Sequence, residues 1–361
     1  MLSERIKRLS ESEVRKMFQS ARPGSANLSL GQPDWKPSAE LVESAKQSLE
    51  SASYAPSQGY LPLREKISQE YRFVKSAENV VVTCGSSAAL SLSLLSLADV
   101  GQEVIIPDPY FISYKSLSMA LGLNPVFADA YPAFELPVEK IRSAISEKTA
   151  VILLNSPNNP TGLVHEKEDI RAVCEIAEEK GITVISDEVY HGLAFEKKAY
   201  SPASDFSNVV TLNSFSKIAA IPGYRVGWAS GPSEFIESMG AINTFFTAGA
   251  PLPFQIALSQ ASWDASGALG ELREKRDLIW DELGARYDFN KPEGAFYAFL
   301  KSPSGSAASF VALLSTKGVI AAPGKGFSEK DSHFRISFAA PKPTLEQAIR
   351  GLKEAVRSVA R

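Results

Sequence analysis

Three charged side chains that could carry chemistry lie close together in the second half of the sequence. Lys217 ends the run Asn213-Ser214-Phe215-Ser216-Lys217, Arg225 comes eight residues later, and Asp187 comes thirty residues earlier. An ε-amine can form an imine with an aldehyde, and a guanidinium can make bidentate contacts with a phosphate. Asp187 follows the apolar run Thr183-Val184-Ile185-Ser186. A buried carboxylate there requires a cationic partner, which a protonated pyridine nitrogen would supply.

Two loops that follow other apolar runs carry further candidates. Gly85-Ser86-Ser87 opens a helical stretch, so its amides and hydroxyls could bind a phosphate against the helix dipole, although a tight structural turn is equally consistent with it. Asn155-Ser156-Pro157-Asn158-Asn159-Pro160-Thr161-Gly162 could be turn chemistry alone, or a rigid loop that fixes the Asn159 amide against a phenolic oxygen. A lone lysine is more often solvated, so the interpretation of Lys217 depends on its conjunction with the other two charged residues.

The elements that must position these residues alternate between strand-like and helical stretches. Residues 87–97 and 168–180 have helical patterns, and the strand candidates are 79–83, 103–106, 150–154, 183–186 and 209–212. Continuous apolar strands separated by helices are typical of a mainly parallel sheet covered on both faces. Ligands bind beyond the carboxyl ends of such strands, which is where the candidate residues fall. The predicted fold class is therefore α/β.

The two ends of the chain differ from this central part. Residues 3–20 have the apolar stripe of a helix, and Asn27-Leu28-Ser29-Leu30 reads as a short strand. A long helical region over 253–287 precedes strand-like pieces at 295–300, 318–321 and 333–338. The pattern predicts a large domain over residues 40–255 and a smaller α+β domain formed by residues 1–39 and 256–361.

The composition of the 361 residues narrows the possible functions. With 44% hydrophobic residues, 22% charged residues and a formal net charge of −3, we expect a globular protein that does not bind nucleic acid. Cys84 and Cys174 favour a reducing compartment over a disulfide framework. His165, His191 and His333 lack the spacing of metal ligands, so no metal is expected. The sequence shows neither a signal peptide nor an apolar run of about 18 residues, and we expect a cytoplasmic protein without membrane partners.

In their order along the chain, these motifs resemble those of the class I/II aminotransferase family, which are fold-type-I enzymes that depend on pyridoxal 5'-phosphate (PLP). The most specific are Asn159-Pro160-Thr161-Gly162, Ser186-Asp187-Glu188-Val189-Tyr190 and Ser214-Phe215-Ser216-Lys217, and the resemblance extends from Gly31-Gln32-Pro33-Asp34 to Phe334-Arg335-Ile336-Ser337. It implies a large PLP-binding domain with a mainly parallel, seven-stranded type of sheet, a smaller α+β domain, and transfer of an amino group between an amino acid and a 2-oxoacid.

The resemblance also implies a role for each cofactor-binding position. Lys217 would form the imine with the cofactor and later move the substrate Cα proton, and Asp187 would pair with the pyridinium nitrogen. Asn159 and Tyr190 would donate hydrogen bonds to the phenolic oxygen, and Phe111 would stack on the ring. The phosphate would be bound by Ser86, Ser87, Ser214 and Arg225.

Substrate and subunit contacts follow from the same resemblance. Arg335 would clamp the substrate α-carboxylate, with Gly31 and Asn159 as further contacts. Tyr54 would reach the phosphate of the neighbouring subunit's cofactor in a homodimer. Ser87 occupies the position where relatives that act on aspartate often carry a cation, which is an argument against strict dicarboxylate specificity. The substrate pocket would be lined by apolar or aromatic residues that could equally belong to the core: Trp35, Tyr60, Tyr114 and Phe327.

We therefore expect an aromatic, branched or small apolar amino donor, with 2-oxoglutarate as an acceptor. A PLP-dependent C–S β-lyase is the main alternative, because the same lysine can serve several reactions. Decarboxylation is disfavoured, because Arg335 would retain the carboxylate. A regulator that only senses PLP or an amino acid would usually carry a DNA-binding domain, and residues 1–30 are too few for one.

Overall fold

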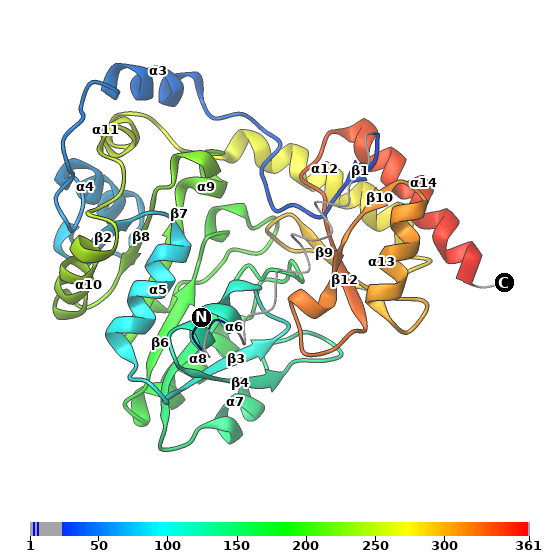
Figure 1. The fold of residues 1–361 in the computed structure, drawn as a ribbon, viewed down its shortest axis with the longest axis horizontal. Helices are drawn as coiled ribbons and strands as arrows, with labels where there is room; N and C mark the ends of the chain where they lie inside the picture. Colours follow the sequence, from blue (N-terminus) through cyan, green and yellow to red (C-terminus); the bar gives the residue numbers. More distant parts are fainter. Residues whose placement is uncertain (1–2, 4–5, 7–23, 360–361) are drawn as a thin grey trace.

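The central sheet of the computed structural model has seven strands in the order β2-β8-β7-β6-β5-β3-β4 (Figure 1). The structure describes residues 3, 6 and 24–359, so the helix expected over residues 3–20 lies almost entirely outside the described residues. All pairs in the sheet are parallel except those made by β8, which runs antiparallel to both of its neighbours. The strands are β2 (Val80–Thr83), β3 (Glu103–Asp108), β4 (Asn124–Asp129), β5 (Thr149–Asn155), β6 (Thr183–Asp187), β7 (Val209–Ser214) and β8 (Gly227–Ser230).

Both faces of this sheet are buried, as the continuous apolar runs predict. Consecutive side chains of a strand point to opposite faces, so Val184 packs in one hydrophobic cluster and Ile185 in another. The sheet is covered by α5 (Ser86–Leu97), α6 (Ser113–Ala120), α7 (Val138–Ala144), α8 (Lys167–Glu179) and α10 (Ser233–Phe246). The α/β fold class and the mainly parallel sheet predicted from the sequence are therefore confirmed.

Two strands and one helix boundary differ from the sequence prediction. The sequence pattern did not reveal β4, an edge strand that begins Asn124-Pro125, or β8, which is only four residues long. The single helical region expected over 253–287 is two helices, α11 (Leu252–Gln260) and α12 (Ser266–Leu283). Between them the chain is extended at Ala261, and the Asp264 side chain accepts a hydrogen bond from the Ser266 amide. The remaining helices before α10 are α3 (Ala39–Ser48), which packs on α11, α4 (Leu61–Glu70), and the short α9 (Phe215–Ile218).

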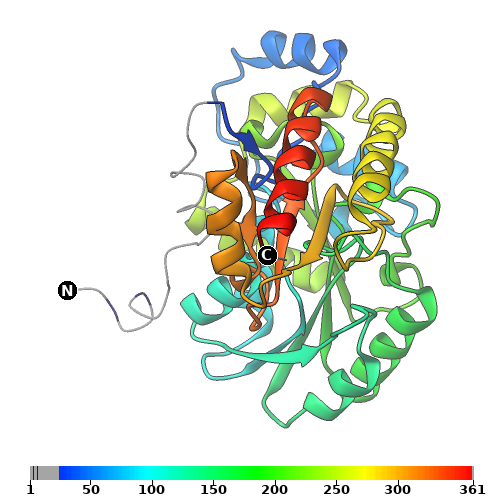
Figure 2. The same ribbon diagram turned by 90° about the vertical axis from the view of Figure 1, so that its right-hand side faces the viewer.

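The C-terminal part forms a separate, smaller layer of strands and helices. An antiparallel sheet has the order β11-β12-β9, and the N-terminal strand β1 pairs with β10. Figure 2 shows α14 between α12 and α13 over these strands. The domain boundaries at residues 39/40 and 255/256 stay a prediction. The elements are β1 (Ala26–Asn27), β9 (Tyr297–Lys301), α13 (Ala307–Thr316), β10 (Val319–Ile320), β11 (Ala322–Pro323), β12 (His333–Ser337) and α14 (Lys342–Val359).

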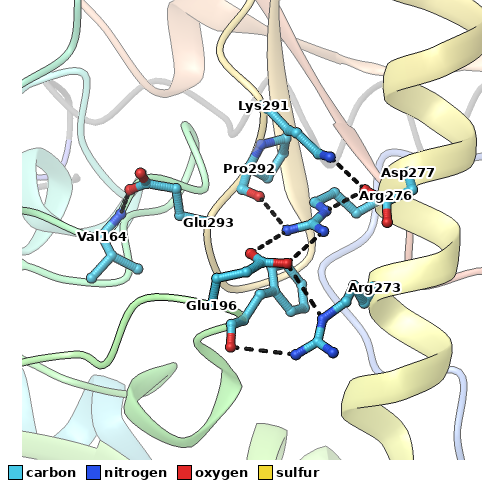
Figure 3. A network of polar contacts seen from close by, with 9 residues as sticks. Val164, Glu196, Arg273, Arg276, Asp277, Lys291, Pro292 and Glu293 are labelled. Carbon is cyan, nitrogen blue, oxygen red and sulfur yellow. Dashed lines mark hydrogen bonds and ion pairs between the residues drawn. The ribbon is translucent and has the colours of Figure 1, made fainter.

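A network of ion pairs and hydrogen bonds links the C-terminal layer to loops of the large sheet (Figure 3). Arg276 of α12 donates two hydrogen bonds to the carboxylate of Glu196, at 2.7 and 2.8 Å, and a third to the Pro292 carbonyl oxygen at 3.3 Å. Glu293 accepts a hydrogen bond from the Val164 amide at 2.9 Å. Because residues 292 and 293 lead into β9, these contacts fix the position of β9 relative to the carboxyl ends of the large sheet.

No helix among the described residues is long and apolar enough to cross a membrane. Five 3-10 helices complete the described structure: η1 (Ala77–Asn79), η2 (His191–Leu193), η3 (Pro202–Ser204), η4 (Pro222–Tyr224) and η5 (Gly324–Gly326).

Candidate active site

A cavity of about 300 Å³ lies where the carboxyl ends of β5, β6 and β7 face β9 and β12. This is the edge at which parallel sheets bind ligands. The sequence-predicted residues that line the cavity are Gly31, Ser86, Ser87, Phe111, Tyr114, Asn159, Asp187, Tyr190, Ser214, Lys217, Arg225, Phe327 and Arg335.

Asp187 is the last residue of β6, and its carboxylate is buried. The Tyr114 hydroxyl donates to Oδ2 at 2.7 Å and the Val189 amide donates to Oδ1 at 3.3 Å. Burial raises the pKa of Asp187 to about 6, because desolvation outweighs the hydrogen bonds that favour the charged form. Among the described residues Asp187 has no ion-pair partner, so this carboxylate fits a ligand that brings a cationic nitrogen.

Lys217 is positioned by the short helix α9, which begins directly after β7. The Ser214 hydroxyl caps this helix by accepting a hydrogen bond from the Ser216 amide at 3.1 Å. The Lys217 ε-amine donates to the Gly31 carbonyl oxygen at 2.5 Å. Desolvation, with smaller effects of Arg335 and Arg225, lowers the pKa of Lys217 to about 8. A depressed pKa makes the neutral, nucleophilic amine accessible near physiological pH.

Groups that could bind an anion converge at the N-terminus of α5. Gly85 precedes this helix with φ +82°, and a Cβ added there would come 2.3 Å from Nη2 of Arg225. The guanidinium of Arg225 donates to the Cys84 and Pro222 carbonyl oxygens, at 3.2 and 2.9 Å, which holds it beside the helix terminus. With Ser86 in the first turn of α5, a guanidinium, a hydroxyl and a helix N-terminus converge, which fits a phosphate.

Arg335 on β12 is a second guanidinium that lines the cavity. It is 3% exposed, and its guanidinium lies between the rings of Tyr297 and Phe327, 4.4 and 4.3 Å from their centroids. One Nη donates to Asn159 Oδ1 at 3.0 Å and the other to the Ser29 carbonyl oxygen at 2.6 Å. Nε is buried without a hydrogen-bond partner among the described residues. A planar, partly unsatisfied guanidinium is suited to a carboxylate.

The loop that carries Asn159 is tied to the strand that carries Asp187. The Asn155 side chain donates to the Asp187 carbonyl oxygen at 2.9 Å and accepts from the Asn159 amide at 2.8 Å. Asn155 thus links β5 to β6 and holds the main chain of Asn159, whose side chain lines the cavity. The polar and proline-rich loop is therefore more than turn chemistry.

Three predicted residues lie outside the cavity: Trp35, Tyr54 and Tyr60. Trp35 was expected to contact the substrate, but its ring packs edge-on against Phe296 at a centroid distance of 6.0 Å. Asp34 beside it is paired with Lys275 at 2.5 Å, which turns this segment toward α12 and away from the cavity. Tyr54 is 87% exposed on the outer surface, where a neighbouring molecule could reach it.

Sequence reasoning missed one residue at the centre of the site. Tyr297 lines the cavity, and its hydroxyl lies 2.8 Å from that of Tyr190. The run Ala295 to Leu300 predicted a strand, but alternation alone does not distinguish a core tyrosine from one in a cavity. Of the four aromatic pocket candidates, Tyr114 and Phe327 line the cavity, whereas Tyr60 does not.

Comparisons with known proteins agree with this geometry. Residues 24–352 match the family described as aminotransferase class I and II. The chain is 34% identical to a probable aspartate aminotransferase of Methanocaldococcus jannaschii, over 98% of this chain and 99% of that protein. It is 30% identical to aromatic-amino-acid aminotransferase 2 of Thermococcus litoralis, over 99% and 98% of the two chains.

The fold is also similar to solved structures. A double mutant of Thermus thermophilus aspartate aminotransferase superposes with a TM-score of 0.92 at 29% identity, over 98% of this chain and 99% of that chain. The family match over most of the sequence agrees with the resemblance that the motifs indicated. This chain belongs to the class I and II aminotransferase family and is a PLP-dependent transaminase.

Proposed function

We propose that this transaminase prefers amino donors with aromatic, branched or small apolar side chains, with 2-oxoglutarate as acceptor. The charge balance of the cavity supports this preference. Four lining residues are charged, and each has a role toward the cofactor or the α-carboxylate: Asp187, Lys217, Arg225 and Arg335. Among the described residues, no further cation lines the cavity to bind a distal carboxylate.

The proposed roles follow from the chemistry of these side chains. Bound PLP supplies the electron sink that accepts the electrons of the broken substrate Cα–H bond. Asp187 binds the ring nitrogen, Arg225 binds the phosphate, and Arg335 orients the α-carboxylate. Lys217 takes the proton from the substrate Cα, for which a pKa of about 8 is well matched.

The substrate side chain would contact an apolar wall of the cavity. Leu30, Ile112 and Phe327 line the cavity and carry no charge. Ser87 lies at the start of α5, where it offers a hydroxyl. Burying a distal carboxylate against this wall would cost desolvation without a partner, whereas an apolar side chain gains about 25 cal/mol per Å² buried.

Steady-state kinetics with a panel of amino donors tests the proposal. We expect kcat/KM for phenylalanine and leucine to exceed that for aspartate, with 2-oxoglutarate as acceptor. Ser87→Lys should raise kcat/KM for aspartate by roughly 10-fold, because it adds a cation to the cavity. Ser91→Lys, one turn further along α5 and outside the cavity lining, is the matched control. A wild-type preference for aspartate would refute the proposed specificity without affecting the transaminase assignment.

We further propose a homodimer in which Tyr54 reaches the neighbouring subunit's cofactor phosphate. Tyr54 and Phe245 are 87% and 89% exposed, and Phe246 is 62% exposed. The segments are neighbours, because Asn243 of α10 donates to the Ser57 carbonyl oxygen at 3.0 Å. Clustered exposed aromatic side chains are typical of an interface. Sedimentation should show a dimer, and Phe245→Asp should shift it toward the monomer and weaken cofactor binding.

A further inference from the structure

The Tyr297 hydroxyl lies in a space that is open because residue 31 is a glycine. Tyr297 is 1% exposed, and its oxygen lies so close to Gly31 that a Cβ added to Gly31 would come 2.1 Å from it. The ring of Tyr297 stacks against the guanidinium of Arg335 at 4.4 Å. A side chain larger than hydrogen at position 31 would displace the hydroxyl, so the site depends on both residues.

The bond between the Tyr190 and Tyr297 hydroxyls, 2.8 Å long, can run in either direction. Each hydroxyl has one proton to donate. Among the described residues, the Tyr297 hydroxyl has no other hydrogen-bond partner. If Tyr190 donates to the phenolic oxygen of the cofactor, its proton is no longer available to Tyr297. Tyr297 must then be the donor and Tyr190 the acceptor.

We propose that Tyr297 is a positioning residue that donates to the Tyr190 hydroxyl and so commits the Tyr190 proton to the phenolic oxygen of the cofactor. This inference rests on the cofactor placement given under the proposed function. A hydroxyl that accepts one hydrogen bond becomes a better donor of its own proton, because the chain of bonds polarises it. Tyr297 therefore tunes the cofactor through Tyr190, without touching the phenolic oxygen itself.

The charged groups around this pair come from several elements. Arg335 of β12 contacts the Tyr297 ring, Lys217 of α9 lies 5.7 Å from the adjoining Phe296 ring, and Asp187 ends β6. Tyr297→Phe preserves the aromatic ring and all of these groups and removes only the hydroxyl. A change in the cofactor spectrum of this variant therefore reports the missing hydrogen bond.

The test is a pH titration of the absorbance of the PLP-loaded enzyme, which reports the pKa of the lysine–cofactor imine. Donation to the phenolic oxygen disfavours the protonated imine, so weaker donation should raise this pKa. We expect Tyr297→Phe to raise it by roughly 0.5 to 1 unit, and Tyr190→Phe by more. The double variant should match Tyr190→Phe alone, because Tyr297 acts through Tyr190. Tyr287→Phe, which loses a buried hydroxyl bound to the Leu352 carbonyl oxygen and does not line the cavity, should show no shift.

Three outcomes would overturn the inference, and they are distinguishable. A shift in Tyr190→Phe without one in Tyr297→Phe would refute the role of Tyr297 alone. Additive shifts in the double variant would mean that Tyr297 acts on the cofactor independently. No shift in Tyr190→Phe would refute the cofactor placement as well. If Tyr297→Phe does not fold, Gly31→Ala displaces the hydroxyl while both tyrosines remain, and should shift the pKa in the same direction.

Discussion

The ε-amine of Lys217 donates a hydrogen bond to the main-chain carbonyl oxygen of Gly31, 2.5 Å away. This bond joins α9, at the end of a large-sheet strand, to the segment that follows β1. The Gly31 carbonyl is a neutral hydrogen-bond acceptor for the amine, whereas the positive charges of Arg335 and Arg225 disfavour the protonated amine. The geometry therefore favours an amine that loses its proton readily and is held at the wall of the cavity.

Replacing Lys217 tests whether this amine is the one that reacts. Lys217→Ala should abolish the imine absorbance band and lower turnover by roughly 10²-fold to 10⁴-fold or more, because both nucleophile and base are lost. Lys217→Arg keeps the positive charge but cannot form the imine, and should be equally inactive. Absorbance spectra and single-turnover assays measure both effects. Near-normal transamination by Lys217→Ala would contradict the assignment.

The buried carboxylate of Asp187 predicts a pH-dependent effect of the cofactor on stability. Its pKa is raised from 3.8 to about 6 in the folded protein, so its contribution to stability is present below pH 4 and is lost as the pH rises through 6. A protonated ring nitrogen would compensate the charged form. The increase in Tm on adding PLP should therefore be larger above pH 6 than at pH 4.5. Thermal melts with and without PLP measure it, and Asp187→Asn should lack this dependence.

The sequence was informative about the site wherever a polar motif follows a buried strand. Asp187 ends β6, and Asn159 and Lys217 come after β5 and β7. Because these strands are parallel, their carboxyl ends lie at one edge. The motifs that could carry chemistry therefore lie at neighbouring strand ends, and most of the predicted residues line one cavity. The fold class was predictable for the same reason, since buried parallel strands read as continuous apolar runs.

Contacts between distant segments were not predictable from spacing. Tyr297 and Trp35 are both aromatic residues near apolar runs, yet one lines the cavity and the other packs on Phe296. Their placement depends on how the small sheet docks against the large one, and no local pattern encodes that. The break between α11 and α12 has the same origin, because Trp263 within it packs against Phe215 beside the large sheet.

Gly85 predicts a steric effect on cofactor binding. Gly85→Ala should place a methyl group 2.3 Å from Arg225 Nη2 and displace the guanidinium. We expect PLP affinity to fall by roughly 10-fold to 100-fold, which corresponds to the loss of one charge-assisted hydrogen bond. Gly101→Ala is a matched control, because Gly101 also has a positive φ, +91°, but no heavy atom within 4 Å of the added Cβ. Equal PLP affinities in the two variants would contradict the steric argument.

The network in Figure 3 predicts a stability effect at Arg276. Its side chain is 4% exposed and donates to Glu196 and to the Pro292 carbonyl oxygen. Arg276→Met should lower the free energy of unfolding by about 1 to 2 kcal/mol, because a buried hydrogen bond to the Pro292 carbonyl oxygen and two partly buried ones to the exposed Glu196 carboxylate are lost. Arg273→Met is the control, since Arg273 is 46% exposed and its ion pair with Glu196 is 3.4 Å long, and it should cost less than about 1 kcal/mol. Urea unfolding measures both, and equal losses would refute the buried contribution.

Replacing Arg335 should weaken substrate binding and leave cofactor binding largely intact. Arg335→Lys keeps a positive charge but loses the planar fork that lies between Tyr297 and Phe327. We expect KM for the amino donor to rise by roughly 10-fold to 100-fold, because one charge-assisted hydrogen bond to the α-carboxylate is lost, while the affinity for PLP changes little. Arg225→Lys should show the opposite pattern, with weaker PLP binding and little change in KM at saturating PLP. If Arg335→Lys released PLP and left KM unchanged, Arg335 would belong to the cofactor site and not to the substrate site.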